Sequence, residues 1–226
     1  MTTVKIKINT HKHGNINPVD LTIGKILPDS PTFDNKFILC DVDGVLLDWA
    51  AGFDKWMFKK GYTYKNSTAY LMEDRFENLT HDEGKKFIKE FNESEDIGDL
   101  EPLRDAVVGV RVLYSLGYNF ATISSHSSLD EACERREECL SRIFGKEIFS
   151  SYIHLDTGAD KDTVLERYNT LDYWWIEDKT ENALAGAKVG LRSLLMHHDF
   201  NASDNHEELT RVHTWEDIVR VITTSA

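Results

Sequence analysis

The segment FILCDVDGVLL, residues 37–47, ends an apolar run with two aspartates that are separated by one residue. The apolar run predicts a buried β-strand, and the ligand crevice of a parallel α/β sheet lies at the carboxyl ends of such strands. Because side chains alternate along a strand, Asp41 and Asp43 can point to the same side, and Gly44 allows a sharp turn behind them. Such a pair can hold Mg²⁺ and aim a free carboxylate at a phosphorus atom, although paired acids also occur in solvated turns. The apolar flanks argue against a calcium loop, which needs additional oxygen ligands.

A second strand-like run, YNFATISSH at residues 118–126, ends in hydroxyl side chains. Ser128 and Glu131, which follow it, have the spacing of a capping box and predict the start of a helix. A hydroxyl group at a strand end, beside the free N–H groups of a helix, can bind phosphate. Ser124 is the preferred candidate for this role, with Thr122 as the alternative two positions earlier. A serine-rich helix cap without a ligand is the other interpretation.

Two later segments place charged residues where strands meet helices. Lys161 lies in GADKDTVLERY, residues 158–168, at the predicted start of a helix. The segment YWWIEDKTENA, residues 173–183, predicts a strand that ends in Glu177 and Asp178. Neighbouring carboxylates repel each other unless a proton or a cation lies between them, and a divalent metal ion meets that condition.

In this order and context, the four segments resemble the four motifs of the haloacid dehalogenase (HAD) superfamily of phosphotransferases. The resemblance implies a nucleophilic aspartate, a second aspartate that acts as acid and base, a lysine that offsets phosphoryl charge, and Mg²⁺ as cofactor. It assigns the catalytic roles to Asp41, Asp43 and Lys161, and phosphate binding to Ser124, Ser125 and Gly44. It assigns the metal site to Asp41, Asp178 and the backbone carbonyl oxygen of Asp43, with Glu177 supporting the metal shell.

The beginning and the end of this region also resemble the 5'(3')-deoxyribonucleotidase family. Residues 41–49, DVDGVLLDW, are close to its DVDGVLADF pattern, and the strand and turn that end at Asn201 are similar to its late segment. The resemblance implies that Trp49 helps to hold the base of a nucleotide. Two departures leave base and sugar preference open: the second motif reads Ser-Ser-His instead of Thr-Ser-Pro, and Asp199 rather than proline precedes Phe200.

The alternation of predicted strands and helices indicates an α/β fold with a doubly wound parallel sheet. Residues 36–48 and 105–226 are expected to form the HAD-like core. Residues 49–104, a charged and aromatic insertion after the first strand, resemble the small helical cap of many HAD phosphatases. Residues 1–35 precede the core and are expected to form a β-hairpin or an edge strand.

Within the predicted cap, Trp49, Phe53 and Trp56 have the spacing of one helix face. The hypothesis is that Trp49 and Phe53 bind the substrate. The alternative for Phe53 and Trp56 is that they form the core between the cap helices.

Composition narrows the class of protein. The chain has 226 residues, 41% of them hydrophobic, and a formal net charge of −13, which disfavours duplex nucleic acid as a partner. No apolar stretch approaches the roughly 18 residues of a membrane span, and the first residues are unlike a signal peptide, so a cytoplasmic protein without a membrane partner is expected. The cysteines have no metal-ligand spacing, and their odd number fits a reducing compartment. The dense charges of residues 130–142 predict a solvated helix face.

The sequence therefore predicts an Mg²⁺-dependent phosphate monoester hydrolase that acts through an aspartyl-phosphate on a small phosphorylated substrate, a nucleoside 5'-monophosphate in the first instance. A phosphotransferase or phosphomutase, a sugar-phosphate phosphatase and a nucleic-acid 3'-end phosphatase could use the same core. A noncatalytic binding protein is less favoured because both the nucleophile and the acid are present.

Overall fold

The computed structural model describes residues 4–8, 36–169 and 171–225. Within these ranges the strands form one seven-stranded sheet in the order β1-β4-β3-β2-β5-β6-β7. All neighbouring strands are parallel except the pair of β1 and β4. The strands are β1 (Val4–Ile8), β2 (Phe37–Cys40), β3 (Asn119–Ser124), β4 (Phe149–Leu155), β5 (Trp174–Glu177), β6 (Arg192–Met196) and β7 (Thr210–Val212).

The predicted doubly wound α/β fold is confirmed by the strand order. From the central strand β2 the chain proceeds through β3 and β4 to one side of the sheet, and then through β5, β6 and β7 to the other. Parallel sheets bind their ligands outside the carboxyl ends of the strands where the order reverses. That position lies at the ends of β2 and β5, directly before Asp41 and Asp178.

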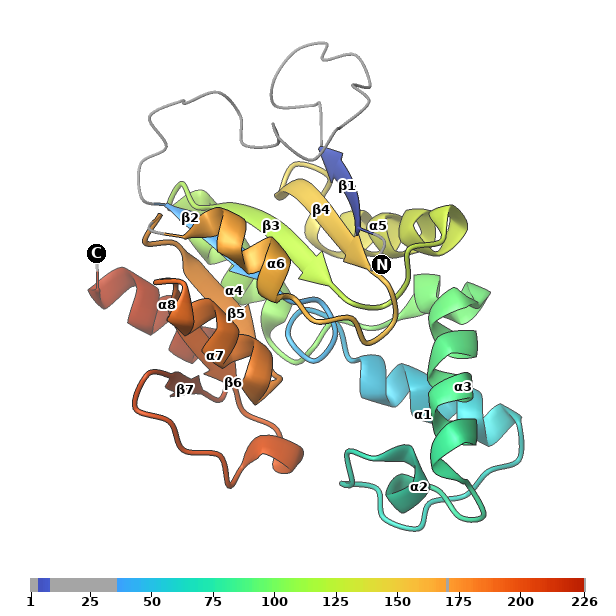
Figure 1. Ribbon diagram of the computed structural model, residues 1–226. Coiled ribbons are helices and arrows are strands. Elements are labelled where there is room, and N and C mark those ends of the chain that lie inside the picture. The colour runs from blue at the N-terminus through green and yellow to red at the C-terminus, as the bar shows by residue number, and fades with distance from the viewer. Residues whose placement is uncertain (1–3, 9–35, 170, 226) are drawn as a thin grey trace.

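Two apolar layers hold helices against the sheet. On one face, Ile38 and Phe120 pack in a cluster with residues of α4 (Ala106–Ser115), α5 (Asp130–Phe144) and α8 (Trp215–Thr224). On the other, Leu39 and Trp175 pack with residues of α6 (Asp162–Leu165) and α7 (Thr180–Lys188). In Figure 1, α6 and α7 lie in front of the sheet and α4 behind it. Alternate residues of β2 thus enter opposite layers, as a strand buried on both faces requires.

The chain between β2 and α4 forms a separate group of helices, here called the inserted helices: α1 (Trp49–Lys59), α2 (Met72–Arg75), α3 (His81–Glu93) and the short 3₁₀ helix η2 (Glu95–Asp99). They lie at the lower right of Figure 1, beyond the carboxyl end of β3. Asp48 begins α1, because its side chain accepts a hydrogen bond from the Ala51 N–H, and Thr80 begins α3 through a capping box with Glu83.

One predicted capping box is wrong. Helix α5 begins at Asp130 without a side-chain cap, and Ser128 Oγ hydrogen-bonds the Asp156 carboxylate instead of capping the helix. The N-cap position of α5 is Leu129, so Ser128 lies one residue too early to cap the helix, and its hydroxyl group donates to the carboxylate that follows β4. The helix predicted to begin at Lys161 is short, since α6 ends at Leu165 and is followed by the 3₁₀ turn η3 (Glu166–Tyr168).

At the amino-terminal side, β1 is an edge strand, antiparallel to β4. Residues 9–35, on which a predicted hairpin would depend, lie outside the described residues. None of the helices in the described ranges combines the length and the apolar character that crossing a membrane requires.

Candidate active site

Three carboxylates meet at the carboxyl ends of β2 and β5. The parallel register pairs Cys40 with Ile176, and the Asp41 N–H donates to the Ile176 carbonyl oxygen at 2.9 Å. Asp41 therefore lies level with Glu177, and Asp178 follows. One oxygen atom from each of the three carboxylates lies within 4.8 Å of the others. The sequence prediction that these acids converge is correct in its geometry, because parallel strands end at the same edge.

Lys161 is the counter-charge of this cluster. Its Nζ lies 2.8 Å from Asp41 Oδ1 and 2.7 Å from Glu177 Oε2, and only 1% of the residue is exposed. Glu177 is fully buried, and its Oε1 accepts hydrogen bonds from the backbone N–H groups of Asp178 and Lys179, each at 3.0 Å. Glu177 thus fixes both Lys161 and the start of the loop that carries Asp178.

Negative charge exceeds positive charge in this cluster. Burial, and next the charge of Glu177, raise the pKa of Asp41 well above its ordinary value, although Lys161 lowers it. Burial, and next the charge of Asp41, raise the pKa of Asp178 to about 7. A divalent cation would relieve this repulsion, and the donor set, which consists of carboxylate oxygens, suits Mg²⁺. Glu177 already accepts three hydrogen bonds, so Asp41 and Asp178 are the better direct ligands.

Gly44 has a structural role rather than the predicted role in phosphate binding. It has a φ of +75°, and a Cβ atom at this position would lie 2.0 Å from Asp178 Oδ2. Its N–H donates to the Leu47 carbonyl oxygen at 2.9 Å, and its carbonyl oxygen accepts from His198 Nε2 at 2.7 Å. Both backbone groups are therefore occupied, and glycine is required because the Asp178 carboxylate approaches so closely.

Asp43 is held by a residue that the sequence interpretation missed. The buried guanidinium group of Arg136, on α5, forms an ion pair with the Asp43 carboxylate through Nη1, and its Nη2 lies 3.3 Å from Oδ2. The prediction of a solvated face over 130–142 is wrong at Arg136 and Glu137, both of which are buried. The signal was available: Arg136 lies at i+4 from Ala132 and i−4 from Leu140, which places it on the apolar face of the helix.

The two serines after β3 occupy different positions. Ser124 pairs in register with His154 and shares the sheet face of Cys40 and Thr122, and its buried Oγ has no hydrogen-bond partner among the described residues. Ser125 Oγ donates to the Ala159 carbonyl oxygen at 2.8 Å, and therefore contacts the loop that precedes Lys161. Phosphate binding by either serine stays a prediction.

Trp49 and Phe53 differ in what they can reach. Phe53 is fully buried between Trp49, Phe91 and other rings, so its assignment to substrate binding is wrong and it belongs to the core of the inserted helices. Trp49 is only partly buried. Its ring stacks on Phe53 with centroids 4.8 Å apart, and its Nε1 donates to Asn92 Oδ1 at 2.8 Å. Trp49 can therefore offer only the exposed part of its ring.

Two further residues near the site were not predicted as site residues. Asn201 is buried, and its Nδ2 donates to the carbonyl oxygens of Asp178 at 2.7 Å and Met196 at 2.8 Å, which fixes the backbone of the Asp178 loop. Tyr70, between α1 and α2, is 50% exposed and contacts Phe200, with ring centroids 4.8 Å apart. Desolvation, and then the charge of Asp178, raise the pKa of Tyr70 to about 12.

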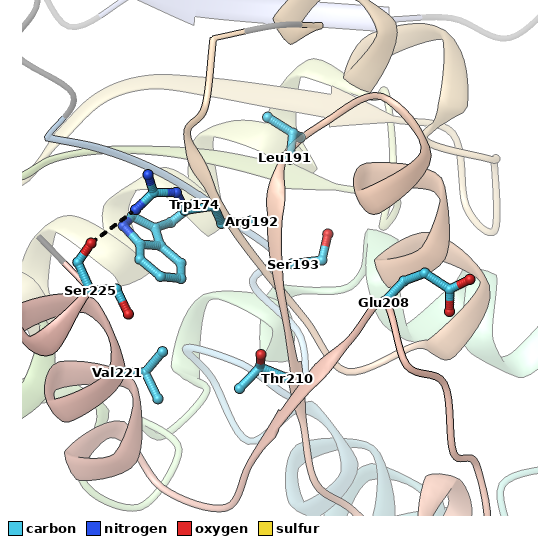
Figure 2. A pocket seen from close by; sticks show the side chains of 8 residues that line it. All are labelled: Trp174, Leu191, Arg192, Ser193, Glu208, Thr210, Val221 and Ser225. Atoms are coloured by element: carbon cyan, nitrogen blue, oxygen red, sulfur yellow. Dashed lines mark hydrogen bonds between the residues drawn. The ribbon is translucent and has the colours of Figure 1, made fainter.

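A separate pocket lies at the opposite end of the sheet. It is an open cavity of about 450 Å³. Figure 2 shows its lining side chains, among them Arg192, which donates to the Ser225 carbonyl oxygen beside Trp174. Trp174 and Arg192 begin β5 and β6, so the pocket is at the amino ends of the strands, whereas Asp41 and Asp178 lie at the carboxyl ends.

Comparisons with known proteins found a sequence relative and solved structures of similar fold. An uncharacterized 32.4 kDa protein from the Gp30–rIII intergenic region of Enterobacteria phage T4 is 25% identical over 192 residues, which are 80% of this chain and 67% of that protein. A predicted phosphatase from Clostridium acetobutylicum superposes with a TM-score of 0.60 at 15% identity, over 84% of this chain and 98% of its own. A haloacid dehalogenase-like hydrolase from Streptococcus pneumoniae has a TM-score of 0.55 at 14% identity, over 83% and 98% of the two chains. No family model matches the chain.

At these identities the likeness to solved structures shows the fold alone. The fold is that of HAD-superfamily hydrolases and phosphatases, as the four sequence motifs predict. The resemblance to deoxyribonucleotidases stays a prediction.

Proposed function

We propose that this protein is an Mg²⁺-dependent phosphate monoester hydrolase that acts through an aspartyl-phosphate intermediate. The observation that carries the proposal is the cluster in which Lys161 contacts both Asp41 and Glu177, with Asp178 beside them. A buried carboxylate next to an ammonium group and a cation-binding edge is suited to attack an anionic phosphoryl group, because both positive charges offset the repulsion.

The roles of the side chains follow from their partners. An Asp41 oxygen attacks phosphorus, the bond from phosphorus to the ester oxygen breaks, and the Asp43 carboxyl group gives its proton to the departing alkoxide. Asp43 then removes a proton from a water molecule, which cleaves the acyl phosphate and releases inorganic phosphate and free Asp41. Lys161 offsets the phosphoryl charge, and Arg136 orients Asp43. When bound at Asp41, Asp178 and the Asp43 carbonyl oxygen, Mg²⁺ would supply further electrostatic stabilisation.

Metal binding can be measured without turnover. Chelator-treated protein should unfold at a higher temperature when Mg²⁺ is added, because the ion relieves the repulsion between Asp41 and Asp178. Asp178→Asn should reduce this shift, since the amide carries no charge to neutralise. An equal shift in the wild type and in Asp178→Asn would place the ion elsewhere.

For the substrate, we propose nucleoside 5'-monophosphates, in their deoxy forms first. Support comes from exposed aromatic surface: part of the Trp49 ring, eight residues after Asp41, and the half-exposed ring of Tyr70, whose pKa the charge of Asp178 raises. Both belong to the inserted chain between β2 and α4, which we propose acts as a cap over the site. Aromatic side chains bind nucleobases by stacking, and this stacking depends little on which base is bound.

A panel of phosphate esters tests the function. Deoxynucleoside and nucleoside 5'-monophosphates, sugar phosphates and acetyl phosphate would be compared by kcat/KM, with Mg²⁺ and with EDTA. Hydrolysis that EDTA abolishes and Mg²⁺ restores is expected, with the highest kcat/KM for a nucleotide. Preference for a sugar phosphate over every nucleotide would remove the substrate proposal, whereas inactivity on all esters would remove the hydrolase proposal.

A further inference from the structure

A second group of metal-ligating side chains lies apart from the carboxylates. His126 follows β3, Cys133 lies in the first turns of α5, and His154 is in β4. One ligand atom of each lies within 4.8 Å of the others, and the residues are 0%, 5% and 2% exposed. The sequence prediction that the cysteines lack metal-ligand spacing holds for the linear pattern only. The fold brings together three residues that are far apart in the chain.

The imidazole rings of this group are short of partners. Among the described residues, no group meets hydrogen-bond geometry with Nδ1 of His154 or with either ring nitrogen of His126, although the Ala132 backbone lies near the His126 ring. A neutral imidazole has one donor and one acceptor nitrogen. Leaving such groups buried without partners is unfavourable, so this region of the protein is suited to a ligand that accepts nitrogen lone pairs.

Other contacts keep the rings in place. His154 Nε2 pairs with Glu137 Oε1 at 3.1 Å, so Nδ1 is the nitrogen that remains for a ligand. A carboxylate behind a histidine is the usual support of a metal-binding imidazole. The backbone carbonyl oxygen of His126 accepts a hydrogen bond from Asn92 Nδ2 at 3.0 Å and another from Thr157 Oγ1 at 2.5 Å, which holds the loop.

Ligand chemistry selects the kind of metal. Two imidazole nitrogens and a thiolate suit Zn²⁺ and similar transition ions, whereas Mg²⁺ and Ca²⁺ prefer oxygen. The carboxylate cluster of the active site has the opposite preference. The two sites are therefore chemically distinct.

We propose that His126, Cys133 and His154 form a structural site for a transition-metal ion of the Zn²⁺ type, with one position left for a small fourth ligand. The ion would join the chain after β3, the start of α5 and β4. Arg136, which holds Asp43, lies three residues after Cys133 on the same helix. The ion therefore fixes the part of α5 that orients the acid of the active site. Metal binding does not depend on the proposed phosphatase function; only its effect on turnover does.

The test uses Co²⁺, whose bond to a thiolate gives a charge-transfer band in the near ultraviolet. Full-length protein without a polyhistidine tag would be treated with a chelator and titrated with Co²⁺ in excess Mg²⁺, which occupies the carboxylates. We expect one equivalent of Co²⁺ and a thiolate band in the wild type and in Asp178→Asn. The band should be lost in Cys133→Ser. Cys139→Ser is the matched control, because Cys139 is also buried on α5 but lies outside the group, and it should keep the band.

A second measurement requires no variant. Zn²⁺ at about 100 times its Kd should raise the Tm of the chelator-treated wild type by about 5 °C or more. A wild type that gives no thiolate band, or a band that persists in folded Cys133→Ser, would overturn the proposal, and so would a Tm that Zn²⁺ leaves unchanged.

Discussion

The carboxyl edge of the sheet and the inserted helices are stabilised in different ways. At the edge, buried charges are held by specific polar partners: Lys161 contacts Asp41 and Glu177, and Arg136 contacts Asp43. In the inserted helices, aromatic rings pack around Phe53, and one ion pair, between Arg75 and buried Asp54, joins α2 to α1. The single ring of Phe53 contacts the rings of four other residues: Trp49, Trp56, Phe76 and Phe91.

This difference determines which region tolerates amino-acid substitutions. A buried ion pair depends on the identity and placement of each partner, and removal of one partner leaves an uncompensated charge. Apolar packing tolerates substitutions that conserve volume. We infer that the edge of the sheet sets the chemistry, whereas the inserted helices set the substrate. Substitutions in the two regions should then have effects of different size and kind.

The largest effect is expected for Asp41→Asn. The amide keeps the shape of the side chain but cannot attack phosphorus, so kcat should fall by about 10⁴-fold or more for every substrate. Phosphate release and circular dichroism would be measured on the same preparation, to separate turnover from folding. Substantial turnover in pure, folded Asp41→Asn would rule out the aspartyl-phosphate mechanism.

The next effect concerns the ion pairs at the edge. Lys161→Met should lower kcat by about 10²-fold or more and destabilise the protein by about 3–5 kcal/mol, because Asp41 and Glu177 lose their shared counter-charge. Denaturant unfolding measures the stability. Exposed Lys86, which pairs with Glu90 at 3.6 Å on α3, offers the control: Lys86→Met should change stability by no more than about 1 kcal/mol. Equal losses in the two variants would contradict the contrast between buried and exposed pairs.

Much of the carboxyl edge of the sheet could be predicted from the sequence, because Asp41, Glu177 and Asp178 stand at the ends of apolar runs. Each apolar run predicts the position of a strand, and in a parallel sheet the ligand binds at the carboxyl ends of the strands. The convergence of Asp41 and Asp178 could therefore be predicted without knowing how the helices pack. Contacts between helices and strands are different. Arg136 reaches Asp43 only because α5 packs on the face of β3 and β4, and the group of His126, Cys133 and His154 depends on the same packing.

The failed predictions have local causes. Ser128 had the spacing of a helix cap, but α5 begins one residue later than that spacing requires, and the Ser128 hydroxyl group donates to Asp156, which is close only in the folded chain. Gly44 had the right position for phosphate binding, but Leu47 and His198 occupy its backbone groups. Phe53 shared a helix face with Trp49, and periodicity alone could not tell a core ring from a substrate-facing one.

A smaller effect on kcat is expected for Arg136, through which α5 contacts the carboxyl edge of the sheet. Arg136→Met should reduce kcat by about 100-fold, because Asp43 loses the partner that orients it, while KM changes little. Arg136→Lys, which keeps the charge but not the two-pronged geometry, should recover part of kcat. A variant whose loss is confined to thermal stability would make Arg136 purely structural.

The smallest and most selective effect should come from the inserted helices. Trp49→Ala removes a ring that has one face covered by Phe53, so only its exposed part can contact a base. Stacking of a base on an aromatic ring contributes about 1–3 kcal/mol, and the lower part of this range predicts a loss in kcat/KM of about 5- to 30-fold for nucleoside monophosphates. Acetyl phosphate, which has no base, should be hydrolysed almost as well as by the wild type. Trp49→Phe keeps an aromatic face but loses the hydrogen bond to Asn92, so it should recover most of the nucleotide activity if stacking is the cause. Equal losses for both substrates would mean that Trp49 acts by holding α1 and α3 together, and the inserted helices would then have no demonstrated part in substrate choice.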